Sequence, residues 1–334
     1  MRIRHPVKAA LVLLLFVALV VTGYVIGRYF EAPDEEPRSV MTEGFGRYEE
    51  KIFKNKVYYK KTDVTTLLVM GIDRDTTAAT SLYRSGGQSD FLLLLVIDHE
   101  DKVIRQLQIN RDTMARIHVL SVLGDNAGYR TLQICLSHAY GATQEACAEN
   151  AVEAVSHYLD SIPIDLYMAV DYSAVPTIND LLGGVTVTMD TDFSSLDPEM
   201  GLGKTVTLKG KQAELFVRAR MSVGDGTNAS RQLRQRQWMS GATTLLMEKV
   251  QDNSNFLNEM MSTLGNRLVT NAATGRLINE FNASYNYDRQ PVDEISGQYT
   301  INKQEFVEYH TEPDAVTLWV LSALYRPAEE TRGK

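Results

Sequence analysis

The amino-acid sequence predicts a mixed α/β domain, in which a mixed central β-sheet is flanked by helices on both faces (α-β-α), preceded by one N-terminal transmembrane helix. Short apolar runs that end in glycine or aspartate alternate with longer stretches of helical periodicity. Two of these runs are joined by a short polar turn, as in a β-hairpin. One uncharged apolar stretch near the N-terminus is long enough to cross a bilayer.

Composition and charge exclude several classes of protein. The 334 residues are 44% hydrophobic and 23% charged, which are ordinary globular values and rule out a disordered or fibrous chain. With only two cysteines, the chain is not a disulfide-dense mini-domain. The 34 Lys and Arg against 42 Asp and Glu give a net charge of −8, which argues against a general nucleic-acid binder.

The uncharged run 9–27 is predicted to be a transmembrane signal anchor. It is too long for a typical signal-peptide core, and no small-residue cleavage motif follows it, although a cleaved signal peptide is the alternative. The stub 1–8 is basic and acidic residues follow the run, so the positive-inside rule places the N-terminus in the cytoplasm and the remainder outside the cell membrane. Residues 28–63 are polar and without a sustained period, which indicates a stalk or linker. The main domain is then expected over 64–326, followed by the polar tail 327–334.

The expected strands are short apolar runs bounded by turn residues. The run 65–73 (TTLLVMGID) is typical of a buried strand that ends in a loop. Residues 91–98 and 103–110 read as two strands joined by the turn HEDK. Further strands are predicted at 165–172 and 185–190.

Helices are predicted between these strands. Residues 133–159 contain two helical stretches divided near Gly141, and 173–184 form a helix closed by a pair of glycines. Two more helices are expected at 209–219 and 231–250. This alternation of strands and helices implies a mixed sheet covered by helices.

Charged residues gather at three predicted strand ends, 71–74, 88–90 and 110–113. Loops at strand ends are where α/β proteins bind their ligands. Asp73 and Asp90, flanking one edge of the sheet, would suit a divalent cation such as Mg²⁺ or Mn²⁺ whose shell is completed by phosphate oxygens and water. The alternative is that both aspartates cap turns.

A run of arginines points to an anionic ligand. Guanidinium groups pair with phosphate oxygens through two hydrogen bonds at once, so several that converge indicate a diphosphate. A solvated basic helix face is the alternative, and the net charge disfavours nucleic acid. The five arginines, opposed only by Asp225, are Arg218, Arg220, Arg231, Arg234 and Arg236, with Gln235 beside the last three.

Other candidate residues are isolated. His138 is either a general acid or base or a structural histidine. Cys135 and Cys147 lie on either side of Gly141, where a disulfide would add about 2–4 kcal/mol, and two buried free thiols are the alternative. The chain contains no HExxH, GxSxG, P-loop or GxGxxG motif, which disfavours zinc peptidases, α/β-hydrolases and nucleotide-binding folds.

The order of the motifs resembles the LytR-CpsA-Psr family of cell-wall glycopolymer ligases. The resemblance covers roughly residues 65–250 and rests on LLVMGID, SDFLLLLVID, INRDT, LSHAYG, PIDLYMAVDY, LLGGVTV, KGKQAELFVRAR and SRQLRQRQ. It implies a mixed α/β fold whose apolar pocket takes a polyprenyl chain, with arginines and Mg²⁺ holding the pyrophosphate at its mouth. Members of the family are anchored by one N-terminal transmembrane helix.

The resemblance also implies roles for single residues. Asp73 and Asp90 correspond to the metal-binding aspartates. Arg111, Asp112 and Asp90 correspond to catalytic residues, with Asp112 orienting Arg111 through an ion pair. Among the departures, Gln88 stands where an arginine usually precedes Ser-Asp, and Asn228 stands where an aspartate often precedes Arg231. The residues that correspond to pyrophosphate binders are Arg111, Arg218, Arg220, Arg231, Arg234 and Gln235.

The activity implied by the resemblance is that of a phosphotransferase of the Gram-positive wall. It would move a phospho-glycopolymer, such as teichoic acid, capsule or another wall glycan, from a polyprenyl diphosphate carrier in the membrane onto peptidoglycan. Two alternatives are a non-catalytic protein that binds lipid-linked glycans or regulates wall assembly, and a polyprenyl-pyrophosphatase that uses water as the acceptor.

Overall fold

The computed structural model describes residues 49–74, 86–312 and 314–328. The predicted cytoplasmic stub and transmembrane anchor, and the first part of the predicted stalk, lie outside the described residues. Among the residues that are described, no helix combines the length and the apolarity needed to span a membrane.

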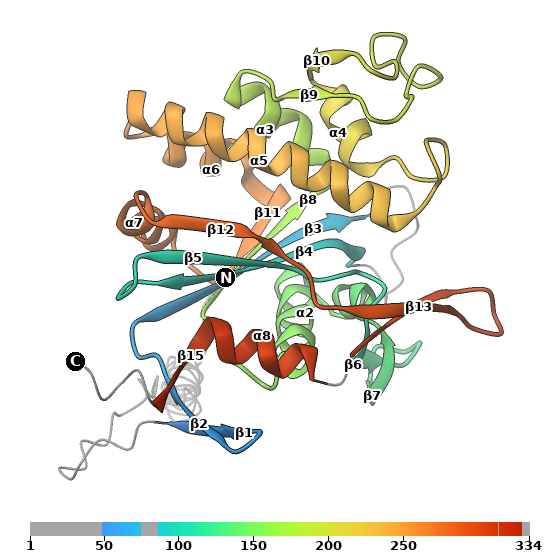
Figure 1. Cartoon of the computed structure of the whole chain (residues 1–334). Coiled ribbons are helices and arrows are strands. Elements are labelled where there is room, and N and C mark those ends of the chain that lie inside the picture. The colour runs from blue at the N-terminus through green and yellow to red at the C-terminus, as the bar shows by residue number, and fades with distance from the viewer. Residues whose placement is uncertain (1–48, 75–85, 313, 329–334) are drawn as a thin grey trace, which may run out of the picture. The chain divides into compact units, whose positions relative to one another are not determined.

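A six-stranded mixed sheet forms the centre of the domain, in the order β11-β8-β3-β4-β5-β12 (Figure 1). The strand β3 pairs antiparallel with β4 and parallel with β8, while β5 pairs antiparallel with β4 and parallel with β12. The predicted mixed sheet and its central hairpin are therefore confirmed. The strands are β3 (Val64–Asp73), β4 (Gln88–Asp98), β5 (Val103–Gln108), β8 (Leu166–Asp171), β11 (Leu268–Thr270) and β12 (Asp288–Asp293).

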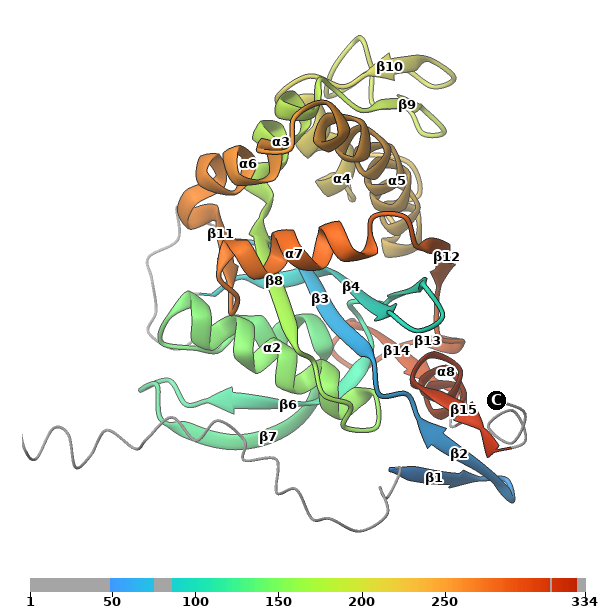
Figure 2. The same cartoon turned by 90° about the vertical axis from the view of Figure 1, so that its left-hand side faces the viewer.

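Helices cover both faces of this sheet (Figure 2). One face packs against α2 (Gln144–Tyr158) and α8 (Ala315–Leu324). On the other face lie α3 (Val175–Leu182), α4 (Lys211–Arg218), α5 (Asn228–Asp252), α6 (Phe256–Leu264) and α7 (Thr274–Ser284). Because β3 and β4 are buried on both faces, their sequences are continuous apolar runs and not alternating ones.

Outside the central sheet, the described residues also form three separate two-stranded hairpins and three 3₁₀ helices. The first of the two helical stretches predicted before Tyr158 is one of the 3₁₀ helices, η1, and only the second, α2, is an α-helix. The hairpins are β6 (Met114–Leu120) with β7 (Asn126–Gln133), β9 (Thr186–Thr188) with β10 (Thr205–Thr207), and β13 (Gly297–Ile301) with β14 (Val307–Thr311). The 3₁₀ helices are η1 (Ile134–Ala139), η2 (Tyr172–Ala174) and η3 (Gly265–Arg267).

The folded domain begins earlier than the sequence analysis predicted. Residues assigned to the stalk form the hairpin of β1 (Glu50–Phe53) and β2 (Lys56–Lys60), and β2 pairs with β15 (Tyr325–Pro327). Lys54 and Asn55 both have positive φ (48° and 63°), as a two-residue hairpin turn of type I′ requires. The sequence signal of these strands is the alternation of polar and apolar residues in EKIF and KVYYK, which the charged residues around it obscure.

The two cysteines are free thiols, so the predicted disulfide is not formed and the alternative of two buried thiols is confirmed. The Cys135 Sγ lies 4.0 Å from Gln88 Oε1, whereas Cys147 packs closely against the backbone of Gly86 and Gly141. Burial raises the pKa of Cys135 to about 12 and that of Cys147 to about 11. Neither side chain is therefore a thiolate at neutral pH.

A buried ion pair joins the N-terminal hairpin to the central sheet. Lys61, which follows β2, has its Nζ 2.7 Å from Asp98 Oδ2 at the end of β4, and the two side chains are only 7% and 4% exposed. Burial alone would raise the pKa of Asp98, but the backbone N–H of Asp101 and the Lys61 ammonium outweigh it and lower the pKa below 3.8. The contribution of this pair to stability is therefore present above the unfolded pKa and is lost as the pH falls through the lower, folded value.

We expect Lys61→Met to lower the free energy of unfolding at neutral pH by about 3–5 kcal/mol, because the buried Asp98 carboxylate is left without its cation. Urea denaturation from neutral pH down to about pH 3 should show this deficit shrinking, because the Asp98 carboxylate of the variant, buried without its cation, is protonated as the pH falls. The control Lys54→Met removes an exposed ion pair with Asp314 and should change stability by less than about 0.5 kcal/mol. Equal stabilities of Lys61→Met and the wild type at neutral pH would contradict this account.

Candidate functional site

Asp90 lies at the centre of the site. Its carboxylate, 4% exposed near the start of β4, is held between two arginines from distant parts of the chain. Arg231 Nη1, from the first turn of α5, lies 2.7 Å from Asp90 Oδ2, and Arg111 Nη1, from the loop after β5, pairs with Asp90 Oδ1. Arg111 Nη2 also donates a hydrogen bond of 2.7 Å to Gln88 Oε1. The sheet order thus brings the second and third charged clusters of the sequence together with the arginine helix.

Asp73 extends the site along the neighbouring strand. It ends β3 directly opposite Gln88, so it lies beside the start of β4 that carries Asp90. Its Oδ1 accepts a 2.6 Å hydrogen bond from Arg218 Nη2 at the C-terminal end of α4. Arg218 also pairs with Glu214 one turn earlier, and its side chain remains 43% exposed. The Asp73 Oδ2 atom accepts no hydrogen bond from any residue that the structure describes.

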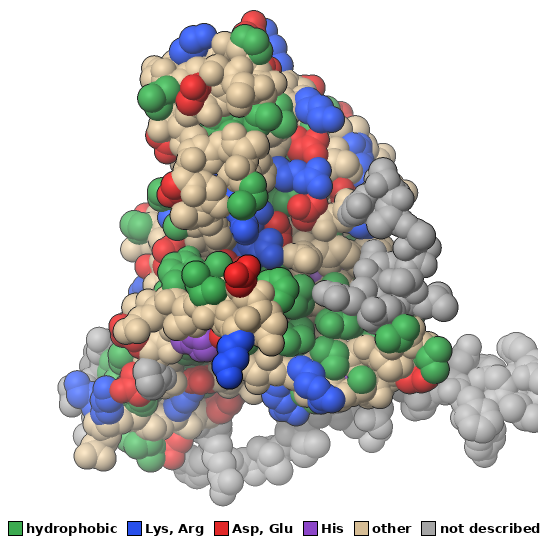
Figure 3. Space-filling view, turned by 90° about the vertical axis from the view of Figure 1, so that its right-hand side faces the viewer, with side chains coloured by type: hydrophobic (Ala, Val, Ile, Leu, Met, Phe, Trp, Pro, Cys, Tyr) green, Lys and Arg blue, Asp and Glu red, His purple; other side chains and the backbone are tan. Residues whose placement is uncertain are grey.

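Asp112 lies on the other side of Arg111. Its Oδ1 is 3.3 Å from Arg111 Nε, which confirms the ion pair that the sequence predicted, and it also accepts a hydrogen bond from Gln133. Burial raises the pKa of Asp112, although the positive charges of Arg111, Arg220 and Arg231 act in the opposite direction. Arg220 makes no ion pair with a described residue and acts on Asp112 through its charge. On the face shown in Figure 3, basic side chains likewise lie directly beside acidic ones.

Two of the five arginines of the run do not belong to this cluster. Arg234 is only 1% exposed: its Nε donates to the Phe216 carbonyl at 3.0 Å, Nη2 donates to Ala219, and the guanidinium lies over the Phe193 ring. It closes the C-terminal end of α4, where a cation favourably meets free carbonyls. The prediction that Arg234 binds pyrophosphate is therefore corrected to a structural role. Arg236 faces away, toward Glu294 and Gln108.

Gln235 connects the cluster to an apolar pocket. Its Nε2 donates to Tyr172 Oη at 2.9 Å, while its Oε1 is buried without a partner among the described residues. The pocket has a volume of about 180 Å³ and lies between the sheet and helices α3, α5 and α6. A Cβ on Gly71 would lie 3.0 Å from both Phe91 and Tyr172, so glycine is needed where β3 borders the pocket. The lining is completed by one threonine, Thr243, and by aliphatic, aromatic and methionine side chains: Val69, Met70, Val170, Val175, Ile178, Leu182, Val217, Trp238, Met239, Ala242, Leu246 and Met260.

Sequence reasoning missed Tyr172 and undervalued two amides. Tyr172 adjoins both the apolar pocket and the charged cluster, and burial raises its pKa. Its signal was its position directly after the strand LYMAVD, at the same sheet edge as Asp73. Gln88 and Asn228, which depart from the family pattern, both bind the arginines: Asn228 Oδ1 accepts from Arg231 Nη2 at 2.8 Å. Neutral acceptors therefore replace charges here without leaving the guanidinium groups unpaired.

The donor atoms present fit a cation that is shared with a ligand. No group of three or more His, Cys, Asp and Glu side chains lies together within the described part of the chain. Mg²⁺ is commonly bound through one or two carboxylates, with phosphate oxygens and water in the remaining positions. Asp73, which has one carboxylate oxygen without a hydrogen-bond partner among the described residues, and the nearby Asp90 offer that smaller set.

Fold and site together define an α/β domain that joins a cationic cluster bearing carboxylates to a narrow apolar pocket. The model of the LytR_cpsA_psr family matches residues 38–321. The chain therefore belongs to the LytR-CpsA-Psr family.

Similar proteins are known from several bacteria. The polyisoprenyl-teichoic acid–peptidoglycan teichoic acid transferase TagU of Bacillus subtilis (strain 168) is 30% identical over 56% of this chain and 53% of its own length. Biofilm regulatory protein A of Streptococcus mutans is 26% identical over 81% of this chain and 64% of its own length. The solved structure of TagT bound to LI-WTA is 20% identical, with a TM-score of 0.59 over 78% of this chain and 89% of that one, and it shares the fold. The chain spans about half the length of the first of these relatives.

His138 lies outside the cluster and is structural. It is fully buried, with Nδ1 at 3.0 Å from the Gly86 carbonyl, and burial lowers its pKa to about 4. Because the unfolded pKa is near 6.5, the unfolded chain binds the proton first as the pH falls. The stability from the neutral imidazole is therefore complete above the unfolded pKa and is lost progressively down to the folded value.

We expect the wild type to lose about 3 kcal/mol of unfolding free energy through His138 between about pH 7 and pH 4. In His138→Asn, the amide N–H can still donate to Gly86 but cannot be protonated, so this part of the pH dependence should disappear. Urea denaturation across that range measures the difference. The control His310→Asn changes a half-exposed histidine and should keep the wild-type slope. Identical slopes for His138→Asn and the wild type would refute the assignment.

Proposed function

We propose that this protein is a phosphotransferase that moves a phospho-glycopolymer from a polyprenyl diphosphate carrier onto a hydroxyl of peptidoglycan. The observation that carries the proposal is the direct contact between the charged cluster and the apolar pocket. Asp73 and Asp90 stand two residues or fewer from pocket-lining Gly71 and Phe91, and Gln235 and Tyr172 border both regions. A ligand with a diphosphate head and a hydrocarbon chain fits this combination.

The similar proteins support the same reaction. TagU is named as a transferase of teichoic acid from a polyisoprenyl carrier to peptidoglycan, and TagT was solved with LI-WTA bound. A membrane anchor at 9–27, with the domain outside the cell, would place the pocket beside its lipid substrate. We propose this topology from the charge pattern of the sequence.

In the proposed reaction the acceptor hydroxyl attacks the phosphorus that bears the glycan. A new oxygen–phosphorus bond forms, the bond from that phosphorus to the bridging oxygen breaks, and polyprenyl phosphate leaves. Arg111, Arg218 and Arg231 hold the diphosphate and neutralise the charge that develops on it. Asp112, whose pKa burial raises, takes the proton of the attacking hydroxyl.

Asp73 and Asp90 would hold Mg²⁺ or Mn²⁺, which supplies further charge neutralisation at the phosphate oxygens. In the absence of substrate, Arg218 engages Asp73 while Arg111 and Arg231 engage Asp90. The arginines and aspartates thus neutralise one another until the substrate binds. The arginines then pair with the diphosphate, and the aspartates pair with its cation. Positioning and electrostatics therefore account for most of the expected rate enhancement.

Arg218→Ala should lower kcat/KM for ligation about 10²–10³-fold, by analogy with the removal of one donor from an oxyanion hole. Arg218 is a suitable probe because its half-exposed side chain can be removed without opening the core. The assay uses a lipid-linked glycan and peptidoglycan fragments, with Arg276→Ala on the exposed face of α7 as the control. Full activity of both Arg218→Ala and Arg231→Ala would show that the assigned site is wrong.

Chelation should abolish transfer, and added Mg²⁺ or Mn²⁺ should restore it, because the cation neutralises phosphate charge in the transition state. The products decide between the proposal and its alternatives. Glycan linked to peptidoglycan supports transfer, and free phospho-glycan indicates a pyrophosphatase. Lipid binding that survives chelation, with neither product formed, indicates a binding or regulatory protein.

A further inference from the structure

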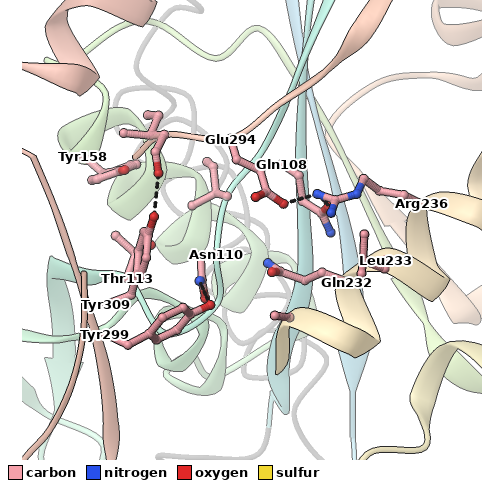
Figure 4. A pocket seen from close by; sticks show the side chains of 13 residues that line it. Gln108, Asn110, Thr113, Tyr158, Gln232, Leu233, Arg236, Glu294, Tyr299 and Tyr309 are labelled. Carbon is pink, nitrogen blue, oxygen red and sulfur yellow. Dashed lines mark hydrogen bonds and ion pairs between the residues drawn. The ribbon is translucent and has the colours of Figure 1, made fainter. Parts of the chain in front are cut away.

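A second cavity lies beside the first turns of α5 and shares no lining residue with the apolar pocket (Figure 4). Its volume is about 210 Å³. Its walls come from the end of β5, from α5, and from β13 and β14 of the C-terminal hairpin. Most of its side chains carry amides, hydroxyls or aromatic rings: Gln108, Asn110, Thr113, Tyr158, Gln232, Arg236, Glu294, Tyr299 and Tyr309, with Ile109, Ala229, Leu233 and Ile295.

Two polar side chains of this cavity make no hydrogen bond with a described residue, and one of them, Thr113, has its polar atom fully buried. Thr113 is 1% exposed, and its hydroxyl has no hydrogen-bond partner in the described part of the chain. Gln232 is 5% exposed, and its amide makes no hydrogen bond with a described residue. Buried polar groups are nearly always hydrogen-bonded, because leaving them unsatisfied costs about 1–3 kcal/mol each. The Thr113 hydroxyl therefore points to a polar ligand, and the Gln232 amide, which is not fully enclosed, is available to bind the same ligand.

The charges and rings of the cavity define what kind of ligand it fits. Arg236 and Glu294 form an ion pair, so the formal charges on the wall cancel. The Tyr299 and Tyr309 rings lie 4.8 Å apart, and Tyr299 is 49% exposed. A phosphate would require unpaired cations and a lipid chain would require an apolar lining. Amides, hydroxyls and an exposed ring suit a neutral molecule that has many hydroxyl groups and also C–H faces, which is a saccharide.

The cavity shares a wall with the charged cluster. Asn110 Nδ2 donates to Tyr299 Oη at 2.6 Å on the cavity side. Asn110 Oδ1 accepts from the backbone N–H of Asp112 at 3.0 Å and from Asn228 Nδ2 at 3.2 Å, and Asn228 in turn holds Arg231. Thr113 faces the cavity, while its chain neighbour Asp112 pairs with Arg111. A ligand in the cavity would thus lie next to the groups that bind and transfer phosphate.

We propose that this cavity is the acceptor subsite, which binds a neutral sugar of peptidoglycan and presents its hydroxyl to Asp112 and Arg111. The inference rests on the proposed function for the identity of the sugar. The apolar pocket and the arginines account for the lipid and diphosphate parts of the donor, and they leave the acceptor without a binding surface. A sugar of the donor glycan has the same chemistry, so the experiment has to separate the two sources.

The test measures binding and kinetics on the full-length protein. Calorimetry with a peptidoglycan disaccharide, in the absence of any lipid, reports the affinity of the cavity itself. Steady-state ligation then gives separate KM values for the acceptor and for the polyprenyl diphosphate donor. The variants are Gln232→Leu, which removes the unpartnered amide, and Tyr299→Ala, which removes the exposed ring. The control for Gln232→Leu is Gln237→Leu on the same helix, because the Gln237 amide donates a hydrogen bond to the Thr188 carbonyl, away from the cavity. The control for Tyr299→Ala is Thr300→Ala, at the next position of β13.

We expect both variants to weaken disaccharide binding and to raise the acceptor KM about tenfold, with the donor KM within about twofold of the wild type. Both controls should behave as the wild type. An unchanged disaccharide affinity, or a rise in the donor KM alone, would overturn the proposal, the latter because the donor glycan then occupies the cavity. If Tyr299→Ala fails to fold, Gln232→Leu decides.

The two proposals can fail separately. Disaccharide binding that depends on Gln232 in a protein without transferase activity would refute the proposed function and retain the saccharide subsite. Transfer with a normal acceptor KM in Gln232→Leu would retain the function and refute the subsite.

Discussion

The site depends on one buried carboxylate. Asp90 joins β4, the loop after β5 and the start of α5 through its ion pairs with Arg111 and Arg231. Removing a charge from water costs several kcal/mol, so such a group persists only where its partners compensate it. Because both carboxylate oxygens are engaged, the two guanidinium groups are fixed side by side at the mouth of the apolar pocket. Without Asp90, two buried like charges would repel each other at this point.

The sequence predicted well whatever depends on local pattern. The strands β3, β4 and β8 follow from continuous apolar runs, and Asp112 lies against Arg111 because the two are adjacent. Arg234 was assigned wrongly because helical spacing tells which residues share a face but not what packs against that face. The second cavity could not be predicted, because the residues that line it, among them Asn110, Gln232 and Tyr299, are far apart in the sequence. The hairpin β1–β2 was overlooked because its alternation is masked by lysines.

The departures from the family pattern show how the cluster tolerates lost charge. Gln88 and Asn228 offer oxygen acceptors to Arg111 and Arg231, so each guanidinium group has a hydrogen bond to a neutral side chain beside its ion pair with Asp90. Gln88 takes the place of an arginine and Asn228 that of an aspartate, so one positive and one negative charge are lost together. The net charge of the cluster is therefore the same as in the family pattern, and an incoming dianion meets the same overall positive charge.

The pairing of β2 with β15 has a consequence for the order of folding. Lys60 lies opposite Tyr325, so the N-terminal edge of the domain is completed by residues near its C-terminal end. Contacts of such high sequence separation form late, because closing the long intervening loop costs entropy before the contact repays it. While the chain is being synthesised, β2 therefore has no partner on that side until β15 has been made. Among the described strands, β15 is the last in chain order, and it completes this edge of the domain.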